Sequence, residues 1–134
     1  MLAESRHLSV YIDRPMPEVY AFASDPANLP RWAAGLGSSV VREQQDWFVE
    51  TPRGRVRVTF APQNEYGVLD HEVVTPSGDT VYVPLRAIPD GDRCEVVFTV
   101  RRAAGTSDAE FERDLALVTA DLALLKKVLE GATD

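Results

Sequence analysis

The residue of this chain best suited to chemistry is His71, because histidine titrates near neutral pH and can serve as a general acid, a general base or a ligand-orienting group. Asp114 and Asp121 lie one heptad apart on the helix predicted at the C-terminal end, beside its apolar face. Either aspartate could pair with His71 or hold a ligand. The alternative is a structural histidine with satisfied hydrogen bonds and two aspartates that contact solvent, lysine or arginine.

Patterns of other reactive or metal-binding sites are absent from the sequence. His7 and His71 are its two histidines and Cys94 is its one cysteine, and their spacing matches no metal site. Cys94 has no neighbouring base in the sequence to activate it and is expected to be an inert core thiol. The motifs GxSxG and GxGxxG and the Walker motif are also missing. We therefore expect no metal and no cofactor.

The charge balance excludes two classes of partner. The sequence has 14 basic and 21 acidic residues and a net charge of −7, whereas nucleic acids and anionic membranes attract basic patches. No stretch approaches the roughly 20 apolar residues of a membrane span, and the first ten residues lack the apolar run of a signal peptide. A single cysteine permits no internal disulfide and fits a reducing compartment. We expect one cytoplasmic domain over residues 1–134.

The elements that position these residues follow from the apolar pattern. Alternation predicts seven strands, at 6–13, 38–44, 46–51, 54–61, 67–75, 79–88 and 92–102. Segment 14–36 predicts two short helices, because proline can open a helix, and the second is expected to end near Gly35 or Gly37. The last helix begins with a capping box between Ser107 and Glu110. Two neighbouring apolar stripes follow it to Gly131, as expected for a helix gripped by a curved sheet: Phe111, Leu115, Val118, Leu122, Leu125 and Leu129, then Leu117, Leu124 and Val128.

Strand register decides which polar residues face inward. A turn at 76–78 pairs Thr75 with Asp79, and this register places His71 opposite Val83. The neighbouring loops predict Val58 opposite His71 and Val83 opposite Phe98. The inner face of the last four strands is then apolar except for His71.

The predicted outer face of the sheet carries pairs of opposite charge. Arg57 is expected opposite Glu72, and Arg86 opposite Glu95. In a second register, shifted by one residue, Asp70 and Glu72 face inward in place of the histidine. A flipped strand would likewise turn Arg86 into an anion-binding residue of the interior.

Four segments of the chain resemble a known family. They are IDRPMPEVYAFASDPANLPRW (12–32), GVLDHEV (67–73), VPLRAIPDG (83–91) and DLALVTADLALLKKVLE (114–130). They are similar to the START-like, SRPBCC superfamily, and most of all to its small bacterial polyketide cyclase/dehydrase-like members. The resemblance implies a helix-grip α+β fold, with a curved seven-stranded antiparallel sheet around the last helix. It also implies a hydrophobic cavity between sheet and helix, with Trp32 near the mouth and His71 inside.

This resemblance and the one-sided apolar sheet predict binding of a small hydrophobic molecule, of a lipid, aromatic or polyketide type, by a monomer or homodimer. One alternative is a polyketide cyclase or dehydratase that uses His71 and Asp121 as acid and base. Another is a protein-interaction module without a ligand, which predicts an exposed apolar patch outside the cavity. Trp32 and Trp47 can line a pocket or fill the core. The predicted ligand-binding residues are Trp32, Trp47, Val58, Phe60, His71, Val83, Phe98, Asp114, Val118, Asp121 and Leu122.

Overall fold

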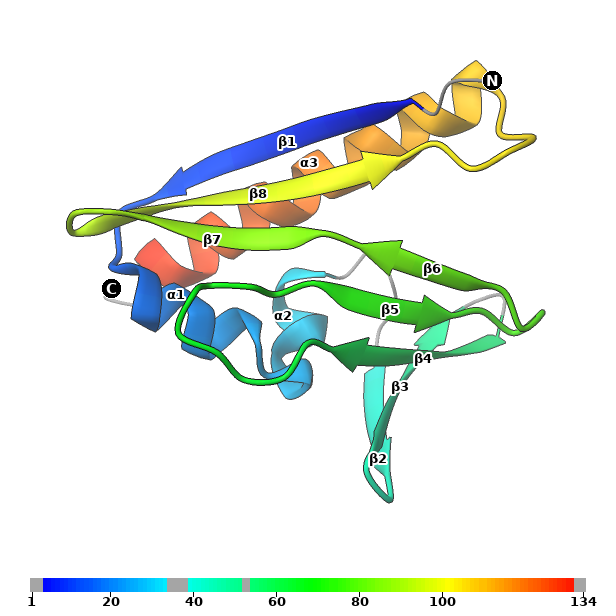
Figure 1. The fold of residues 1–134 in the computed structure, drawn as a ribbon, viewed down its shortest axis with the longest axis horizontal. Coiled ribbons are helices and arrows are strands. Elements are labelled where there is room, and N and C mark those ends of the chain that lie inside the picture. The colour runs from blue at the N-terminus through cyan, green and yellow to red at the C-terminus, as the bar shows by residue number, and fades with distance from the viewer. Residues whose placement is uncertain (1–3, 34–38, 52–53, 132–134) are drawn as a thin grey trace.

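The computed structural model describes residues 4–33, 39–51 and 54–131. They form an α+β fold in which a long C-terminal helix packs along a sheet (Figure 1). The elements, in chain order, are β1 (Ser5–Ile12), α1 (Met16–Ala23), the 3₁₀ turn η1 (Pro26–Asn28), α2 (Leu29–Trp32), β2 (Ser39–Glu43), β3 (Asp46–Thr51), β4 (Gly54–Phe60), β5 (His71–Val74), β6 (Thr80–Val83), β7 (Leu85–Asp90), β8 (Arg93–Arg101) and α3 (Asp108–Gly131).

The strands of the described residues form two antiparallel sheets. One has the order β1-β8-β7 and the other the order β2-β3-β4-β5-β6. Figure 1 shows α3 running along β1 and β8, with α1 and α2 below β7. The apolar core lies between these layers, and its largest fully buried side chains are Ile12, Leu69, Leu85, Leu125, Val19 and Val96.

The division into two sheets occurs at Pro84. The sequence predicts one strand over 79–88, but β6 ends before Pro84 and β7 begins after it. Proline has no N–H to donate to a strand ladder, and the carbonyl of Pro84 instead accepts from Thr99 N at 3.1 Å. The described residues therefore hold eight strands in two sheets, whereas the sequence predicts seven in one. The predicted α+β class, with two short helices after the first strand, is confirmed.

Hydrogen bonds before β5 connect the two sheets. Leu69 N donates to the carbonyl of Leu85, and Ala87 N donates to the carbonyl of Gly67, both at 2.8 Å. Gly67 has a positive φ of 76°, and a Cβ atom there would lie 2.1 Å from the backbone oxygen of Ala87. This close approach requires glycine.

The predicted helix boundaries are mostly confirmed. α1 begins directly after Pro15, and Asp25 ends the helical stretch and accepts from Ala27 N at 3.0 Å, opening η1. The capping box of α3 forms as predicted, with Glu110 N donating to Ser107 Oγ at 3.1 Å and Ser107 N donating to the Glu110 carboxylate at 3.0 Å. The predicted end of the second short helix, near residues 35–37, lies outside the described residues.

The register of the central hairpin is confirmed, with His71 opposite Val83. The two neighbouring registers differ from the prediction by two residues, because Phe60 lies opposite His71, and Leu85 lies opposite Phe98. At the second of these, a tight turn at Gly91, whose φ is 61°, replaces the expected four-residue loop. A shift of two preserves the face of every side chain, since strand side chains alternate with period two.

The predicted outer-face ion pairs are wrong. Because both registers shift by two, Arg57 is not opposite Glu72, and Arg86 is not opposite Glu95. Arg86 instead binds Asp70, with its Nη2 2.8 Å from a carboxylate oxygen.

Candidate functional site

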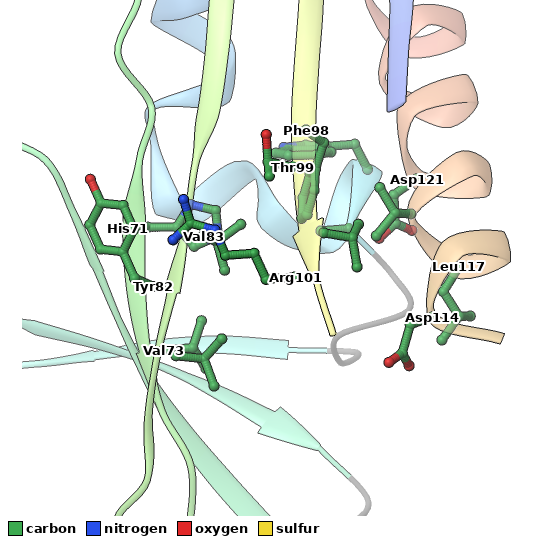
Figure 2. Close-up of a pocket in the computed structure, with 15 residues that line it drawn as sticks. His71, Val73, Tyr82, Val83, Phe98, Thr99, Arg101, Asp114, Leu117 and Asp121 are labelled. Atoms are coloured by element: carbon green, nitrogen blue, oxygen red, sulfur yellow. The ribbon is translucent and has the colours of Figure 1, made fainter. Parts of the chain in front are cut away.

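An open cavity lies between the β5–β6 hairpin, the end of β8 and the helices α2 and α3 (Figure 2). Its volume is about 270 Å³, near the lower limit of about 300 Å³ for small-molecule sites, so it suits a small ligand. Its lining residues are Trp32, Ala33, His71, Val73, Val81, Tyr82, Val83, Phe98, Thr99, Val100, Arg101, Asp114, Leu117, Val118 and Asp121.

The walls of this cavity are mostly apolar. Figure 2 shows Val73 and Val83 on the strand side and Leu117 on the opposite wall, which is formed by α3. Val81 and Leu117 are 49% and 51% exposed, so apolar side chains stand at the open edge. The second apolar stripe of α3 is therefore only partly covered, because at Leu117 the helix borders the cavity and not the sheet.

His71 is held rigidly in the strand wall. The residue is 7% exposed, and its Nδ1 lies 3.0 Å from the carbonyl oxygen of Leu69. The ring of Phe60, its cross-strand neighbour, packs on it with centroids 4.9 Å apart and planes tilted by 30°. These contacts fix both the position and the rotation of the imidazole.

The second ring nitrogen of His71, Nε2, makes no hydrogen bond with the described residues. Among those residues, Trp32 Nε1 is the one fully enclosed side-chain nitrogen or oxygen atom without a partner, so Nε2 of His71 reaches open space. The cavity that His71 lines provides that space.

Burial lowers the pKa of His71 from its ordinary value, because a charged imidazolium is poorly solvated there. The hydrogen bond to Leu69 and the charge of Asp70 act in the opposite direction but are smaller effects. The imidazole is therefore neutral at pH 7. Since a carbonyl can only accept, Nδ1 carries the proton and Nε2 carries the lone pair.

Charged side chains of the cavity come from the other two walls. Figure 2 shows Asp114 and Asp121 on α3, across the cavity from His71. Neither aspartate is a hydrogen-bond partner of His71, contrary to one of the expectations from sequence. Arg101, at the end of β8, makes no hydrogen bond or ion pair with another described residue.

The cavity brings together many of the predicted site residues. Those that line it are Trp32, His71, Val83, Phe98, Asp114, Val118 and Asp121. Val58 lies in the core and Phe60 packs behind His71. Trp47, on β3, has the guanidinium of Arg42 5.8 Å from its ring. Leu122 lies on a second cavity of about 250 Å³, between β1 and α3.

Sequence reasoning missed several lining residues. Thr99 and Arg101 have the opposite strand parity to Phe98, yet successive residues 98–101 all border the cavity, because β8 ends there. Tyr82 also lines the cavity, although it alternates along β6 with the lining residues Val81 and Val83. These residues line the cavity because a strand ends beside it. That arrangement depends on three-dimensional packing and leaves no pattern in the sequence.

A second polar cluster lies at the joint between the two sheets and shares Tyr82 with the cavity lining. Asp70 is 3% exposed and accepts from Tyr82 Oη at 2.5 Å, from Leu85 N at 2.9 Å and twice from Arg86 at 2.8 Å. The Arg86 guanidinium, aided by the other donors, holds the pKa of Asp70 well below its usual range despite burial. Of the three residues that the sequence left open as inward-facing, Asp70 and Arg86 form a structural clamp and Glu72 is exposed.

Neither a metal-binding cluster nor a membrane-spanning helix is found among the described residues. In residues 4–33, 39–51 and 54–131, no three His, Cys, Asp or Glu side chains are grouped so as to hold a metal ion. No helix in that part of the chain has the length and apolar character needed to cross a membrane.

No protein-family model matches the sequence, and no curated protein sequence is significantly similar to it. XoxI from Bacillus cereus has a similar structure, with a TM-score of 0.74 and 10% identity, over 97% of this chain and 98% of that one. DynU16, from the dynemicin biosynthetic locus, gives a TM-score of 0.69 and 15% identity over 94% of this chain, which spans only 47% of DynU16.

Norcoclaurine synthase from Thalictrum flavum, in complex with dopamine and hydroxybenzaldehyde, gives a TM-score of 0.62 and 14% identity over 96% of this chain and 88% of that one. Identities this low show the fold alone. This chain has the helix-grip fold that its resemblance to the START-like, SRPBCC superfamily predicts.

Proposed function

We propose that this protein binds a small hydrophobic molecule non-covalently in the cavity between the β5–β6 hairpin and α3. The observation that carries the proposal is an open hollow of about 270 Å³ with mostly apolar walls and a few polar groups. The norcoclaurine synthase structure supports the size class, because that protein of the same fold is in complex with two small aromatic compounds.

The expected affinity from apolar contact alone is modest. A two-ring ligand that buries about 250 Å² of apolar surface gains about 6 kcal/mol, at ~25 cal/mol per Å². Lost translational and rotational freedom costs at least about 4 kcal/mol of this. Polar groups on the cavity wall must therefore supply part of the affinity and fix the ligand's orientation.

Two experiments test this proposal. One identifies a native ligand, and the other measures ligand binding to a variant whose cavity is blocked. Native mass spectrometry of freshly purified protein, followed by organic extraction, identifies any bound molecule. Titration calorimetry with 2-methoxynaphthalene then compares the wild type with Val118→Phe, which fills the cavity. Val41→Phe makes the same change on β2, at a residue that is 37% exposed and lies outside the cavity lining.

We expect Val118→Phe to weaken binding at least tenfold and Val41→Phe to leave it unchanged. Equal binding by both variants would place the ligand elsewhere. An unliganded native mass, together with no binding of naphthalene derivatives or fatty acids, would instead favour the interaction-module hypothesis.

Proton-transfer catalysis, as in a cyclase or dehydratase, is the second candidate function. It is favoured by the neutral, rigid His71 beside the cavity, since a lone pair at Nε2 suits a general base. Asp121, on the facing helix, is the proposed second acid–base group. The test is the exchange of deuterium into the activated CH₂ of a cyclic 1,3-diketone. His71→Ala should remove any acceleration, and absence of acceleration by the wild type counts against catalysis.

A further inference from the structure

We propose that the cavity selects an aromatic ligand with a hydroxyl group, a phenol or an enol, which donates a hydrogen bond to Nε2 of His71. This inference rests on the proposed ligand-binding function and specifies the chemical class of the ligand. It follows from the fixed tautomer of one buried histidine and from the absence of a hydrogen-bond partner for its Nε2 among residues 4–33, 39–51 and 54–131.

The first step concerns the direction of the hydrogen bond. Nδ1 of His71 lies 3.0 Å from the carbonyl of Leu69, which has no hydrogen to give. Nδ1 is therefore the donor, and in the neutral ring Nε2 can only accept. A ligand carbonyl or ether would bring a second acceptor to this atom, whereas a hydroxyl group would match it.

The second step concerns the rigidity of the imidazole. Phe60 packs on one face of the ring at a centroid distance of 4.9 Å, and His71 is 7% exposed. A flip of the ring would break the hydrogen bond from Nδ1 to the carbonyl of Leu69. The lone pair at Nε2 is therefore preorganised, so a ligand that uses it pays little ordering cost.

The third step is that no donor on the described cavity wall bonds to Nε2 of His71, although Trp32 Nε1 and the Arg101 guanidinium have no hydrogen-bond partner among the described residues. The hydroxyl of Tyr82 is committed to Asp70, and the hydroxyl of Thr99 is bonded to Nδ1 of His7 at 2.9 Å. Arg101 makes no hydrogen bond with His71. Since Nε2 faces the open cavity, a ligand hydroxyl that reaches it gains the net free energy of one hydrogen bond.

The experiment is a double comparison of ligand and protein. Calorimetry at pH 7.5 measures the dissociation constants of 2-naphthol and of 2-methoxynaphthalene, its methyl ether, which lacks the donor. Both are titrated into the wild type and into His71→Phe, which keeps a flat ring but removes the acceptor. The preference is the ratio of the dissociation constant of the ether to that of 2-naphthol. We expect this ratio to be about threefold to tenfold greater in the wild type than in His71→Phe, which is the net effect of one hydrogen bond.

The outcomes separate this inference from the function on which it rests. Binding of neither compound to the wild type overturns this inference, and together with an unliganded native mass and no binding of fatty acids it overturns the ligand-binding function itself. If both compounds bind, and the preference for 2-naphthol is the same in the wild type and in His71→Phe, the ligand-binding function still holds. The proposed role of His71 as hydrogen-bond acceptor is then overturned.

A second measurement applies even where His71→Phe does not fold. Nitrogen-15 NMR of the wild type at pH 7.5 should show a protonated Nδ1 and an unprotonated Nε2 in His71, with His7 as the internal reference for a histidine outside the cavity lining. Addition of 2-naphthol should shift the Nε2 resonance of His71. A protonated Nε2, or no shift at a saturating concentration, contradicts the proposal.

Discussion

The clamp at the joint of the two sheets gives the sharpest stability prediction, for the substitution Asp70→Asn. The Asp70 carboxylate is almost completely buried and accepts four hydrogen bonds, from the Tyr82 hydroxyl, the Leu85 amide and two guanidinium nitrogens of Arg86. Asparagine keeps one oxygen acceptor but turns an NH₂ group toward donors. The change therefore removes a charge and at least one acceptor without changing the size of the side chain.

The expected loss of stability follows from how exposed each hydrogen-bond partner of Asp70 is. Hydrogen bonds to a charged group contribute about 1.5–3 kcal/mol each when buried. The side chain of Arg86 is 51% exposed, so water replaces much of what its two bonds lose. Leu85 is 0% exposed, so water cannot reach its amide. If the single oxygen of the new asparagine turns toward Arg86, the amide of Leu85 is left without an acceptor. We expect a loss of about 2–3 kcal/mol in the free energy of unfolding at pH 7.

The assay is urea unfolding of the wild type, Asp70→Asn and the exposed control Asp79→Asn at two pH values. The folded-state pKa of Asp70 is depressed, so its contribution is complete above the ordinary aspartate pKa of about 3.9 and declines as the pH falls below it. At pH 3.0 about nine-tenths of the unfolded chains are protonated at Asp70. This protonation removes about 1.3 kcal/mol of the difference in the free energy of unfolding between the wild type and Asp70→Asn. A loss under about 0.5 kcal/mol at pH 7, or one that does not shrink at pH 3.0, refutes the clamp.

Three further predictions concern the fold and the thiol. Ser107→Ala should lower the free energy of unfolding by about 1 kcal/mol, because it removes the capping box of α3; thermal unfolding with and without the substitution measures this. Gly67→Ala should cost at least about 2 kcal/mol by urea unfolding, whereas Gly91→Ala, also at positive φ but facing open space, should cost about 1 kcal/mol; equal losses would contradict the steric argument. Cys94, which is 0% exposed and whose pKa burial raises to about 11, should react with Ellman's reagent only after unfolding; rapid reaction of the native protein would contradict its burial.

Local features of the fold were predictable because they depend on neighbours in sequence. The capping box at Ser107 and Glu110 needs only residues three apart, and the start of α1 depends on Pro15. The division of the predicted strand at Pro84 was also readable in principle, since proline cannot donate to a ladder. The inner face of the sheet followed from alternation and survived the two-residue register shifts.

Contacts between distant segments were not predictable in the same way. The expected partner of Arg86 was Glu95 on the adjacent strand, but Asp70 reaches it from the segment before β5. A buried carboxylate looks unfavourable when its donors are unknown, and four donors from three residues make it stable here.

By itself, the sequence determined the positions of most helices and strands, an apolar inner face and His71 as the polar residue on it, because periodicity and turn chemistry are local. The helix-grip class was what its resemblance to a known family implied. Only the tertiary structure decided which residues border a hollow, since Val58 and Phe60 share that face with His71 yet lie outside the cavity lining. It also decided which nitrogen of His71 lacks a partner among the described residues, because the carbonyl of Leu69 bonds to the other. The cavity and the tautomer both depend on how α3 and the strand ends pack, and a one-dimensional pattern does not contain that information.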